Sequence, residues 1–451
     1  MRKPIQIPNP DDGHRRYKDQ MDEAELAAQK SPLAPKKTTK SSAIVRTVLV
    51  IGLFIAGIVL LLTSFFKSDE RKPGWYEINA QMDKKVPKYQ LGEQMTYLFT
   101  GSTKQIKQAE DEVTKLYTAA LKSSFAQLDP KTSYSGYTGI ADINARLGEE
   151  VTVSPELLAV LRDADRLTRE NRGFNLYAGG LYAEWNSILY LADPTEFDPL
   201  NNPDEAERIA RLAEAAADLD NFRLQLTEGE TCTVRLDVSQ EYLALVEDLE
   251  LTDAPILDLN VLQEAYKLQM VADKLESRGY CSGYLTGNRG VTVALSACNA
   301  EGLSYAFTGH QEEGDAPAAY LPITPGSCAV NLLGFAPARQ DGEAEPGYYS
   351  IEQDGTIHYR HPVLASDGQF HDNLLLSAFV WSDKLSPAEA CLACLELYRQ
   401  DSPYETKAFS LTLSDCSAAF LFWDDPMTVW STDPNIIPAS DYRYTGQLLV
   451  K

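Results

Sequence analysis

Apolar residues recur with helical spacing in five segments of the chain. In 103–128, one helical face carries Ile106 and Leu121 among other apolar residues, and a spacing of three to four residues favours an amphipathic helix. The next such segment has clear start signals, because Ser154 is a preferred N-cap residue and Pro155 suits the first helical position. The predicted helices are 103–128, 154–170, 204–219, 261–278 and 386–400.

Short runs that suit strands lie before, between and after these helices. Gly287, Asn288 and Gly290 predict a turn before one of them. Scattered Gly and Pro residues predict a long irregular region at 299–347. The sequence shows no internal repeat, so it predicts a mixed α/β (α+β) fold of one or two lobes. The predicted strands are 95–100, 232–236, 291–297 and 408–413.

One uncharged stretch, within 44–66, is long enough to cross a membrane. Residues 47–66 are almost all apolar, and about 20 such residues span the hydrocarbon of a bilayer as a helix. The stretch starts too far from Met1 for a secretory signal, and no small-residue cleavage site follows it. A buried core helix is the alternative. Basic residues are slightly more frequent before the stretch than after it, which favours a cytoplasmic N-terminus.

These patterns predict a single-pass protein of the cell membrane with a large extracytoplasmic domain. The N-terminal segment is polar, rich in Pro and Lys, and lacks a periodic apolar face, as is typical of disorder. The predicted order is a cytoplasmic disordered tail at 1–43, a transmembrane helix at 44–66, a juxtamembrane linker at 67–84, an ectodomain at 85–435 and a C-terminal tail at 436–451.

Negative charge is concentrated after the apolar stretch. Residues 1–66 hold ten basic and six acidic residues, a net charge of +4. The whole chain carries −24, which leaves −28 for residues 67–451. A domain this acidic is repelled by phosphate backbones. Nucleic acid is therefore excluded as an expected partner.

The seven cysteines all lie after the apolar stretch and show no disulfide framework, because their number is odd and their spacing irregular. Cys391 and Cys394 form a C-x-x-C pair. Such a pair is found in redox sites and in half of a zinc site, but no second pair completes a zinc site. The alternative is that both thiols pack as small apolar side chains on the helix 386–400.

A series of short motifs runs in a fixed order along residues 85–430. The motifs are Gly92, Asp129-Pro130 followed by 153–158, the segment 173–181 with Trp185, Leu257-Asp258-Leu259, His358 with 359–362, and 385–391. Their order resembles that of the ApbE family, the FAD:protein FMN transferases.

The resemblance implies a fold with a cleft between lobes that binds FAD. It also implies that Mg²⁺ binds the pyrophosphate while FMN passes to a Thr or Ser hydroxyl of a client flavoprotein. Carried over position by position, His358 is the catalytic candidate and Glu389 the metal ligand. The candidate cofactor-binding residues are Asp258, Asn260, Glu264, Gly287, Asn288 and Asn175.

Several of these positions depart from the family's pattern. Glu264 stands where the family has Lys, and Ala393 has no side-chain oxygen where the family has a metal-binding Thr. Asp258 has a simpler reading as the cap of the helix that begins near Val261, and Gly287 as part of a hairpin turn. We therefore expect a pseudoenzyme that binds a flavin nucleotide or a partner. The alternative is a working Mg²⁺-dependent transferase acting on an envelope flavoprotein or a membrane redox complex.

Overall fold

The computed structural model describes most of the compact unit Arg71–Lys451. The predicted tail at 1–43, the predicted transmembrane helix at 44–66 and Gly92 lie outside the described residues. In the part that is described, no helix is both long and apolar enough to span a bilayer. The described residues are 71–81, 93–170, 173–189, 194–311, 314–333, 349–360, 368, 370–371 and 374–450.

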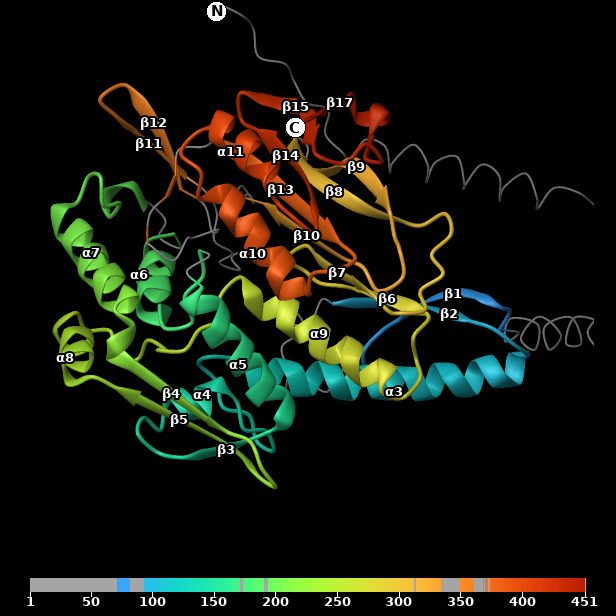
Figure 1. Ribbon diagram of the computed structural model, residues 1–451, viewed down its shortest axis with the longest axis horizontal. Coiled ribbons are helices and arrows are strands. Elements are labelled where there is room, and N and C mark those ends of the chain that lie inside the picture. The colour runs from blue at the N-terminus through green and yellow to red at the C-terminus, as the bar shows by residue number, and fades with distance from the viewer. Residues whose placement is uncertain are drawn as a thin grey trace, which may run out of the picture. The chain divides into compact units, whose positions relative to one another are not determined.

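A nine-stranded sheet forms the centre of the molecule (Figure 1). Its neighbouring strands are antiparallel except for the last pair, in which β17 runs parallel to β15. In spatial order the strands are β1 (Gly74–Ile78), β2 (Gln94–Phe99), β6 (Gly283–Thr286), β7 (Val291–Ala294), β10 (Cys328–Leu333), β13 (Leu375–Ser382), β14 (Ser417–Phe422), β15 (Asp425–Ser431) and β17 (Thr445–Leu448).

Both faces of this sheet are covered, which explains why its central strands are apolar on both sides. In β13, Ala378 and Val380 face the cluster that contains helices α9 (Leu262–Glu276) and α10 (Pro387–Tyr398). Phe379 faces the opposite cluster, formed with a second, three-stranded sheet. That sheet has the order β16 (Ile437–Pro438), β9 (Gly314–Pro322) and β8 (Ser304–Gln311).

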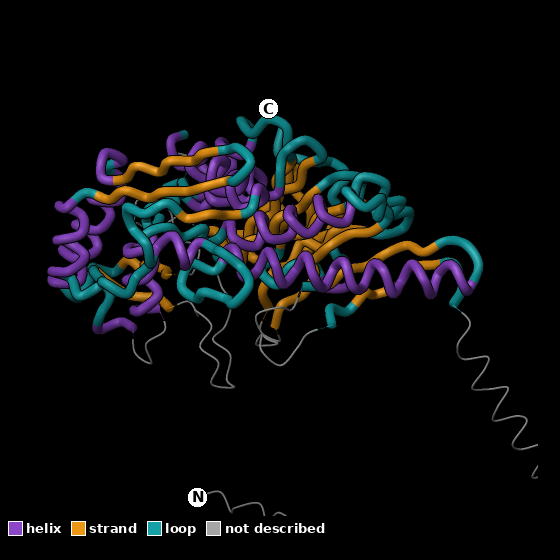
Figure 2. The backbone as a smooth tube through the Cα atoms, turned by 90° about the horizontal axis from the view of Figure 1, so that it is seen from below, coloured by secondary structure: helices purple, strands orange, loops and turns teal. Residues whose placement is uncertain are grey.

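A second lobe is inserted between the neighbouring strands β2 and β6. It begins with the long helix α3 (Thr103–Leu128), which runs alongside β1 and β2 (Figure 2). A three-stranded sheet, β3 (Val151–Val153), β5 (Cys232–Val238) and β4 (Phe222–Thr227), lies within it. The remaining helices of this lobe are α4 (Ile140–Asn144), α5 (Pro155–Arg169), α6 (Gly179–Leu189), α7 (Pro203–Ala217) and α8 (Gln240–Asp248), with the short turns η2 (Pro194–Glu196) and η3 (Leu219–Asn221).

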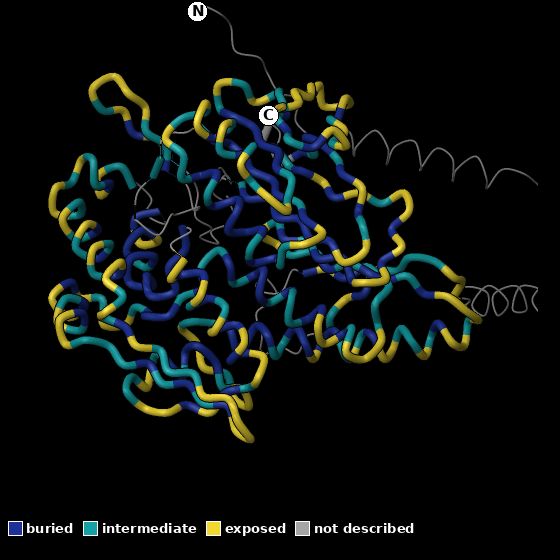
Figure 3. The backbone as a smooth tube through the Cα atoms, viewed as in Figure 1, coloured by how far each residue is buried: buried dark blue, intermediate teal, exposed yellow. Residues whose placement is uncertain are grey.

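The hairpin β11 (Tyr349–Gln353) and β12 (Thr356–Arg360) projects from the body of the protein, and its tip is exposed (Figures 1 and 3). Its base is held by Asp198, whose buried carboxylate accepts two hydrogen bonds from Arg360, at 2.7 and 3.2 Å, and one from the Tyr349 hydroxyl at 2.7 Å. The hairpin is therefore fixed to the second lobe by a buried ion pair.

All five predicted helices are present, and α3 has the predicted bounds. Ser154 caps α5 by accepting a hydrogen bond from the Leu157 amide at 3.0 Å, as expected. The predicted turn also lies where Gly287 and Gly290 place it, between β6 and β7. The mixed α/β fold is confirmed. The division at 85–435 and the cleft between lobes stay predictions.

The predicted strand at 408–413 is wrong. The helix α11 (Pro403–Ser410) covers its first half, because Ser402 caps the helix through the Glu405 amide and Pro403 occupies its first turn. Phe409 lies within the helix, and 411–412 form the turn that follows it.

The predicted irregular region at 299–347 is also wrong over its described part. It contains β8, β9 and β10. Gly326, with φ of +70°, lies in the turn between β9 and β10 rather than in a loop of its own. Pro317 fits into β9 beside a break in register between Phe307 and Thr308, and a proline at such an irregularity costs no ladder hydrogen bond. Two further strands, β16 and β17, lie within the predicted C-terminal tail.

Candidate functional site

The carboxylate of Glu264 fills the turn between β6 and β7. Glu264 lies in the first turn of α9 and is only 4% exposed. Its oxygens accept hydrogen bonds from the backbone N–H of Arg289, at 2.9 and 3.0 Å, and from that of Val291 at 3.2 Å. A methyl group at Gly287 would lie 2.5 and 2.6 Å from the two carboxylate oxygens. Only glycine therefore leaves room for this carboxylate.

The charge of Glu264 is only partly balanced by its surroundings. Burial raises the pKa of Glu264, while the Lys267 ammonium and then the amides of Arg289 and Val291 lower it without cancelling the effect of burial. Lys267 itself forms an ion pair with the fully buried carboxylate of Glu93. The family resemblance implies a cation at position 264, and the structure places there a buried anion bonded to backbone amides.

Asp258 does not cap α9, contrary to the simpler reading of the sequence. The N-cap residue is Val261, which makes no side-chain cap. The Asp258 carboxylate accepts a hydrogen bond from the Asn260 amide at 2.7 Å, and the backbone N–H of Asp258 donates to the Leu176 carbonyl at 2.9 Å. Asn260 has φ of +45°, a conformation that Asn tolerates better than most residues. This local bond replaces the expected cap.

Two exposed cations act on Asp258 from neighbouring loops. Burial raises the pKa of Asp258, and the Lys131 and Arg289 charges oppose that rise. Both cationic residues are exposed, and they lie 158 positions apart in the chain. The loop that carries Lys131 is tied to this region by Asn144, whose amide group exchanges hydrogen bonds with the backbone of Leu257 at 2.9 and 3.0 Å. The Asp129 charge raises the pKa of Asp258 as well, so this region holds carboxylates alongside the two cations.

Glu389, the candidate metal ligand, forms hydrogen bonds within the protein at the start of α10. It forms a capping box with Ser386, whose amide donates to the Glu389 carboxylate at 3.0 Å. The other carboxylate oxygen lies 3.3 Å from the Arg166 guanidinium. Burial alone would raise the pKa of Glu389, but the hydrogen bonds from Ser386 and the charge of Arg166 outweigh it, so the pKa is lowered.

The residues around Glu389 do not fit a Mg²⁺ ion. Magnesium needs several oxygen ligands in octahedral geometry. Ala393, one helical turn on, is buried and has no side-chain oxygen, and Arg166 places a positive charge at the carboxylate. Among the described residues, no group of three His, Cys, Asp or Glu side chains is arranged to hold a metal ion. The expected magnesium site is therefore not supported by these side chains.

Asn175, a candidate cofactor ligand, is buried and bonded within the protein. Its side-chain N–H donates to the Ala216 carbonyl at 2.7 Å, and its side-chain oxygen accepts from the Tyr177 amide at 2.9 Å. The segment that follows packs closely on residues 255–258, since Gly179 donates its N–H to the Ile256 carbonyl at 3.3 Å. Asn175 thus supports the loop that precedes α6, and Phe174 beside it is buried in the core.

His358 lies in β12, opposite Ile351 of β11, and is half-buried. Its strand ends at Arg360, which binds Asp198 of the second lobe. Trp185, another position of the resemblance, is buried close by, where its ring packs against Phe370 at a centroid distance of 4.7 Å. His358 and Trp185 thus lie in the region around Asp198. Glu264, Asp258 and Glu389 lie in a different region, around the start of α9.

The start of α9 brings together four of the segments that carry the candidate residues. Segment 257–265 contacts 174–181 through the Asp258 amide and contacts the β6–β7 turn through Glu264. It contacts α10 through the Cys391 thiol, which lies 3.6 Å from the Val261 carbonyl. We call these residues the α9 junction: 174–179, 256–265, 287–291 and 389–391.

Cys391 and Cys394 behave as packing residues. Both are free thiols and fully buried. Burial raises the pKa of each thiol far above the usual range, and a buried protonated thiol is a poor nucleophile and metal ligand. The redox reading of the C-x-x-C pair is therefore not supported.

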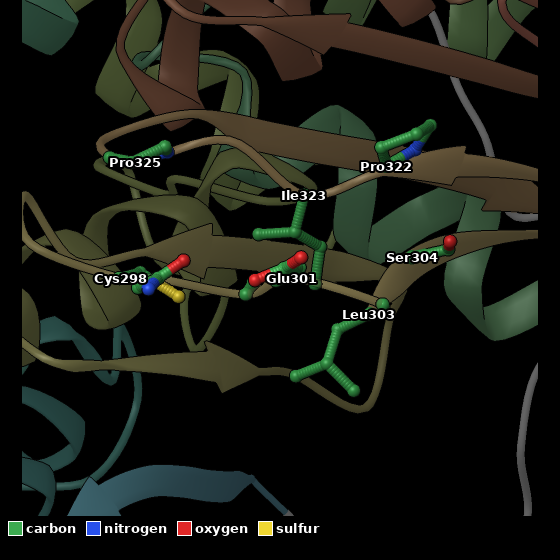
Figure 4. Close-up of a pocket in the computed structure, with 10 residues that line it drawn as sticks. Cys298, Glu301, Leu303, Ser304, Pro322, Ile323 and Pro325 are labelled. Carbon is green, nitrogen blue, oxygen red and sulfur yellow. The ribbon is translucent and has the colours of Figure 1, made fainter.

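A cavity of about 320 Å³ lies away from the α9 junction, beside the sheet that contains β8 and β9 (Figure 4). Its lining includes Cys298, Glu301 and Ile323. Burial raises the pKa of the Cys298 thiol to about 11, so this cysteine also lacks the character of a reactive thiol.

Comparison with known proteins agrees with the motif order. Residues 100–288 match the model of the ApbE family. The resemblance to the ApbE family is confirmed. The match spans the second lobe, α9 and β6, and it ends in the β6–β7 turn. It includes Asp258, Glu264 and Gly287. A search of the curated proteins finds no match to this chain.

Solved ApbE structures share the fold at low identity. The ApbE protein of Thermotoga maritima MSB8 is 12% identical, with a TM-score of 0.50, and the likeness covers 82% of this chain and 98% of that one. The flavin transferase ApbE of Vibrio cholerae is 14% identical, with a TM-score of 0.45 over 75% and 93%. The flavinyl transferase ApbE of Pseudomonas stutzeri is 15% identical, with a TM-score of 0.48 over 78% and 92%. At these identities the likeness concerns the fold alone.

Sequence reasoning missed three partners of the ApbE-like site. Lys131 and Arg289 act on Asp258, and Arg166 pairs with Glu389 across 223 positions. No sequence signal identifies the partners of Asp258 and Glu389, because they lie on other elements. The proximity of Lys267 to Glu264 could have been predicted from the sequence, because residues three positions apart on a helix are neighbours.

Proposed function

We propose that this protein is a membrane-anchored, extracytoplasmic member of the ApbE fold that binds a flavin nucleotide or a partner without transferring FMN. One observation carries the proposal. Glu264 and Glu389 occupy the positions that the resemblance assigns to anion and metal binding, and both are engaged within the protein by hydrogen bonds. Transfer from FAD needs a cation near the pyrophosphate, because charge develops there in the transition state.

Lys131 and Arg289 support the binding part of the proposal. They are exposed, and the charge of each lowers the pKa of Asp258, so each is available to a nucleotide phosphate outside the turn that Glu264 fills. FAD would be the ligand and no catalytic magnesium would be needed. We therefore expect the affinity for FAD to be the same, within about twofold, with and without Mg²⁺.

The test is a fluorescence titration of the full-length chain with FAD, with and without Mg²⁺. Arg289→Ala should weaken binding about tenfold, because one charged contact to a phosphate contributes roughly 1.5 kcal/mol or more. Arg223→Ala is the matched control, since Arg223 is an exposed arginine on β4. Saturable binding that Arg289→Ala weakens and Arg223→Ala does not would support the proposal. Absence of saturable binding would refute its flavin part and leave partner binding.

A working Mg²⁺-dependent transferase is the second candidate. It is favoured by the match to the ApbE family model. The structural likeness to the Thermotoga protein, which covers 98% of that chain, is consistent with it. Incubation of the protein with FAD, Mg²⁺ and a threonine-bearing client peptide, followed by mass spectrometry, separates the two. We expect no peptide that carries covalent FMN. Its appearance would overturn the non-catalytic proposal and favour a client flavoprotein as partner.

The proposed topology rests on the apolar stretch at 44–66. Protease added to intact cells should degrade the domain that follows and spare a tag on Met1. A protected C-terminus would reverse the proposed orientation. In the proposed arrangement, a membrane redox complex or an envelope flavoprotein lies within reach of the extracytoplasmic domain.

A further inference from the structure

The β6–β7 turn has the features of an anion-binding turn. Two of its backbone N–H groups, from Arg289 and Val291, point to one place, and Gly287 adds no side chain of its own there. Backbone N–H groups that converge in a glycine-containing turn form a cavity for anions. Gly290, with φ of +89°, keeps the turn in the conformation that directs these groups inward.

The turn is held in this shape from its other side as well. The Asn331 amide donates a hydrogen bond to the Gly290 carbonyl at 3.0 Å. The Asn331 side chain is buried and fixed in turn by the Thr308 amide at 2.7 Å and by Ser377 at 3.2 Å. These bonds do not involve Glu264, so the turn keeps its scaffold when the carboxylate is removed.

The occupant of the turn is a side chain of the same protein. Glu264 lies on α9 and is buried. Its carboxylate accepts the three hydrogen bonds donated by the backbone amides of the turn. The Arg289 charge acts on this carboxylate too. The anion in the turn is therefore covalently part of the protein and cannot dissociate.

We propose that the β6–β7 turn is an anion-binding site that Glu264 fills from within the protein, and that removal of this carboxylate opens the turn to a phosphate-bearing ligand. The proposal does not rest on flavin binding. It predicts that the wild-type turn excludes phosphate groups, and that any nucleotide must place its phosphates outside the turn.

Inorganic pyrophosphate is the probe, titrated into the full-length chain by isothermal calorimetry. Glu264→Ala should bind pyrophosphate at least tenfold more tightly than the wild type. Glu276→Ala is the matched control, because Glu276 lies on the same helix and also accepts a backbone hydrogen bond, from Ser296 at 2.6 Å. The control should bind pyrophosphate no better than the wild type.

A second variant keeps the test decisive if Glu264→Ala does not fold. Glu264→Ser keeps a polar side chain that is tolerated in the first turn of a helix, and its short side chain no longer fills the turn. It removes the carboxylate while leaving Arg289 in place, and we expect pyrophosphate binding about threefold tighter than in the wild type. Affinities equal to the wild type in the folded Glu264 variants, or an equal gain in Glu276→Ala, would overturn the proposal. Failure of the FAD titration alone would not.

Discussion

Replacing Gly287 by alanine should disrupt the contact between α9 and the β6–β7 turn. The added methyl group would lie 2.5 and 2.6 Å from the oxygens of the Glu264 carboxylate, whereas ordinary contact between heavy atoms begins near about 3.5 Å. The carboxylate must therefore withdraw, and its bonds to the Arg289 and Val291 amides, between 2.9 and 3.2 Å, are lost.

The magnitude follows from these bonds. A hydrogen bond to a charged group contributes roughly 1.5–3 kcal/mol, and two amide donors are involved. Partial relaxation recovers some of this, so we expect Gly287→Ala to lower the free energy of unfolding by about 3 kcal/mol. With Glu264→Ala already present, the clash is absent, and the same change should cost less than about 1 kcal/mol.

The assay is urea unfolding of four proteins: wild type, each single variant and the double variant. The difference between the two costs of Gly287→Ala is the coupling energy, expected at about 2 kcal/mol. Gly229→Ala is the control, because its methyl group would meet only the Thr231 carbonyl at 3.9 Å. An equal loss in both backgrounds would refute the view that Glu264 and Gly287 form one contact.

Three further outcomes are expected. Because the pKa of Glu389 is lowered in the folded protein, its contribution to stability is present above its unfolded pKa and is lost as the pH falls through the folded pKa. The difference in unfolding free energy between wild type and Glu389→Gln should therefore shrink on acidification. A difference that does not depend on pH would contradict this. Asp198→Ala should destabilise the protein by about 3 kcal/mol, measured by urea unfolding, because it leaves the buried Arg360 unpaired; a loss below about 1 kcal/mol would count against the ion pair. Cys391 and Cys394 should resist iodoacetamide in the native protein and react after unfolding, as peptide mass mapping would show, and rapid native labelling would contradict their burial.

Local signals in the sequence were sufficient for the five predicted helices, but not for α4, α6, α8 and α11. The long apolar face of α3 and the Ser154-Pro155 start of α5 depend on residues a few positions apart. The strands of the β8–β9 hairpin were missed, because the Gly and Pro residues scattered through 299–347 suggest irregular structure. In the structure Pro317 is tolerated in β9 where the register breaks, which only the partner strand reveals.

The sequence singled out candidate residues and did not reveal their contacts. The motif order identified Glu264, Gly287 and Glu389 as special positions. The sequence did not reveal that the Glu264 carboxylate fills the turn at Gly287 or that Arg166 reaches Glu389. Such contacts join distant segments, and a single sequence contains no periodicity that reports them. The resemblance therefore located the α9 junction, and side-chain geometry gave its chemistry.

The insertion of a whole lobe between β2 and β6 has a consequence for biosynthesis. These strands are neighbours in the sheet, yet Phe99 and Gly283 are 184 positions apart. At a synthesis rate of about 5–20 residues per second, β2 emerges roughly 10–40 s before its partner. During that interval one edge of β2 is open, and its residues Met95 and Tyr97, buried in the finished protein, await their final packing. Early docking of α3 on β2 would shield them, and a ribosome that stalls before residue 283 would release the form of this chain most exposed to aggregation.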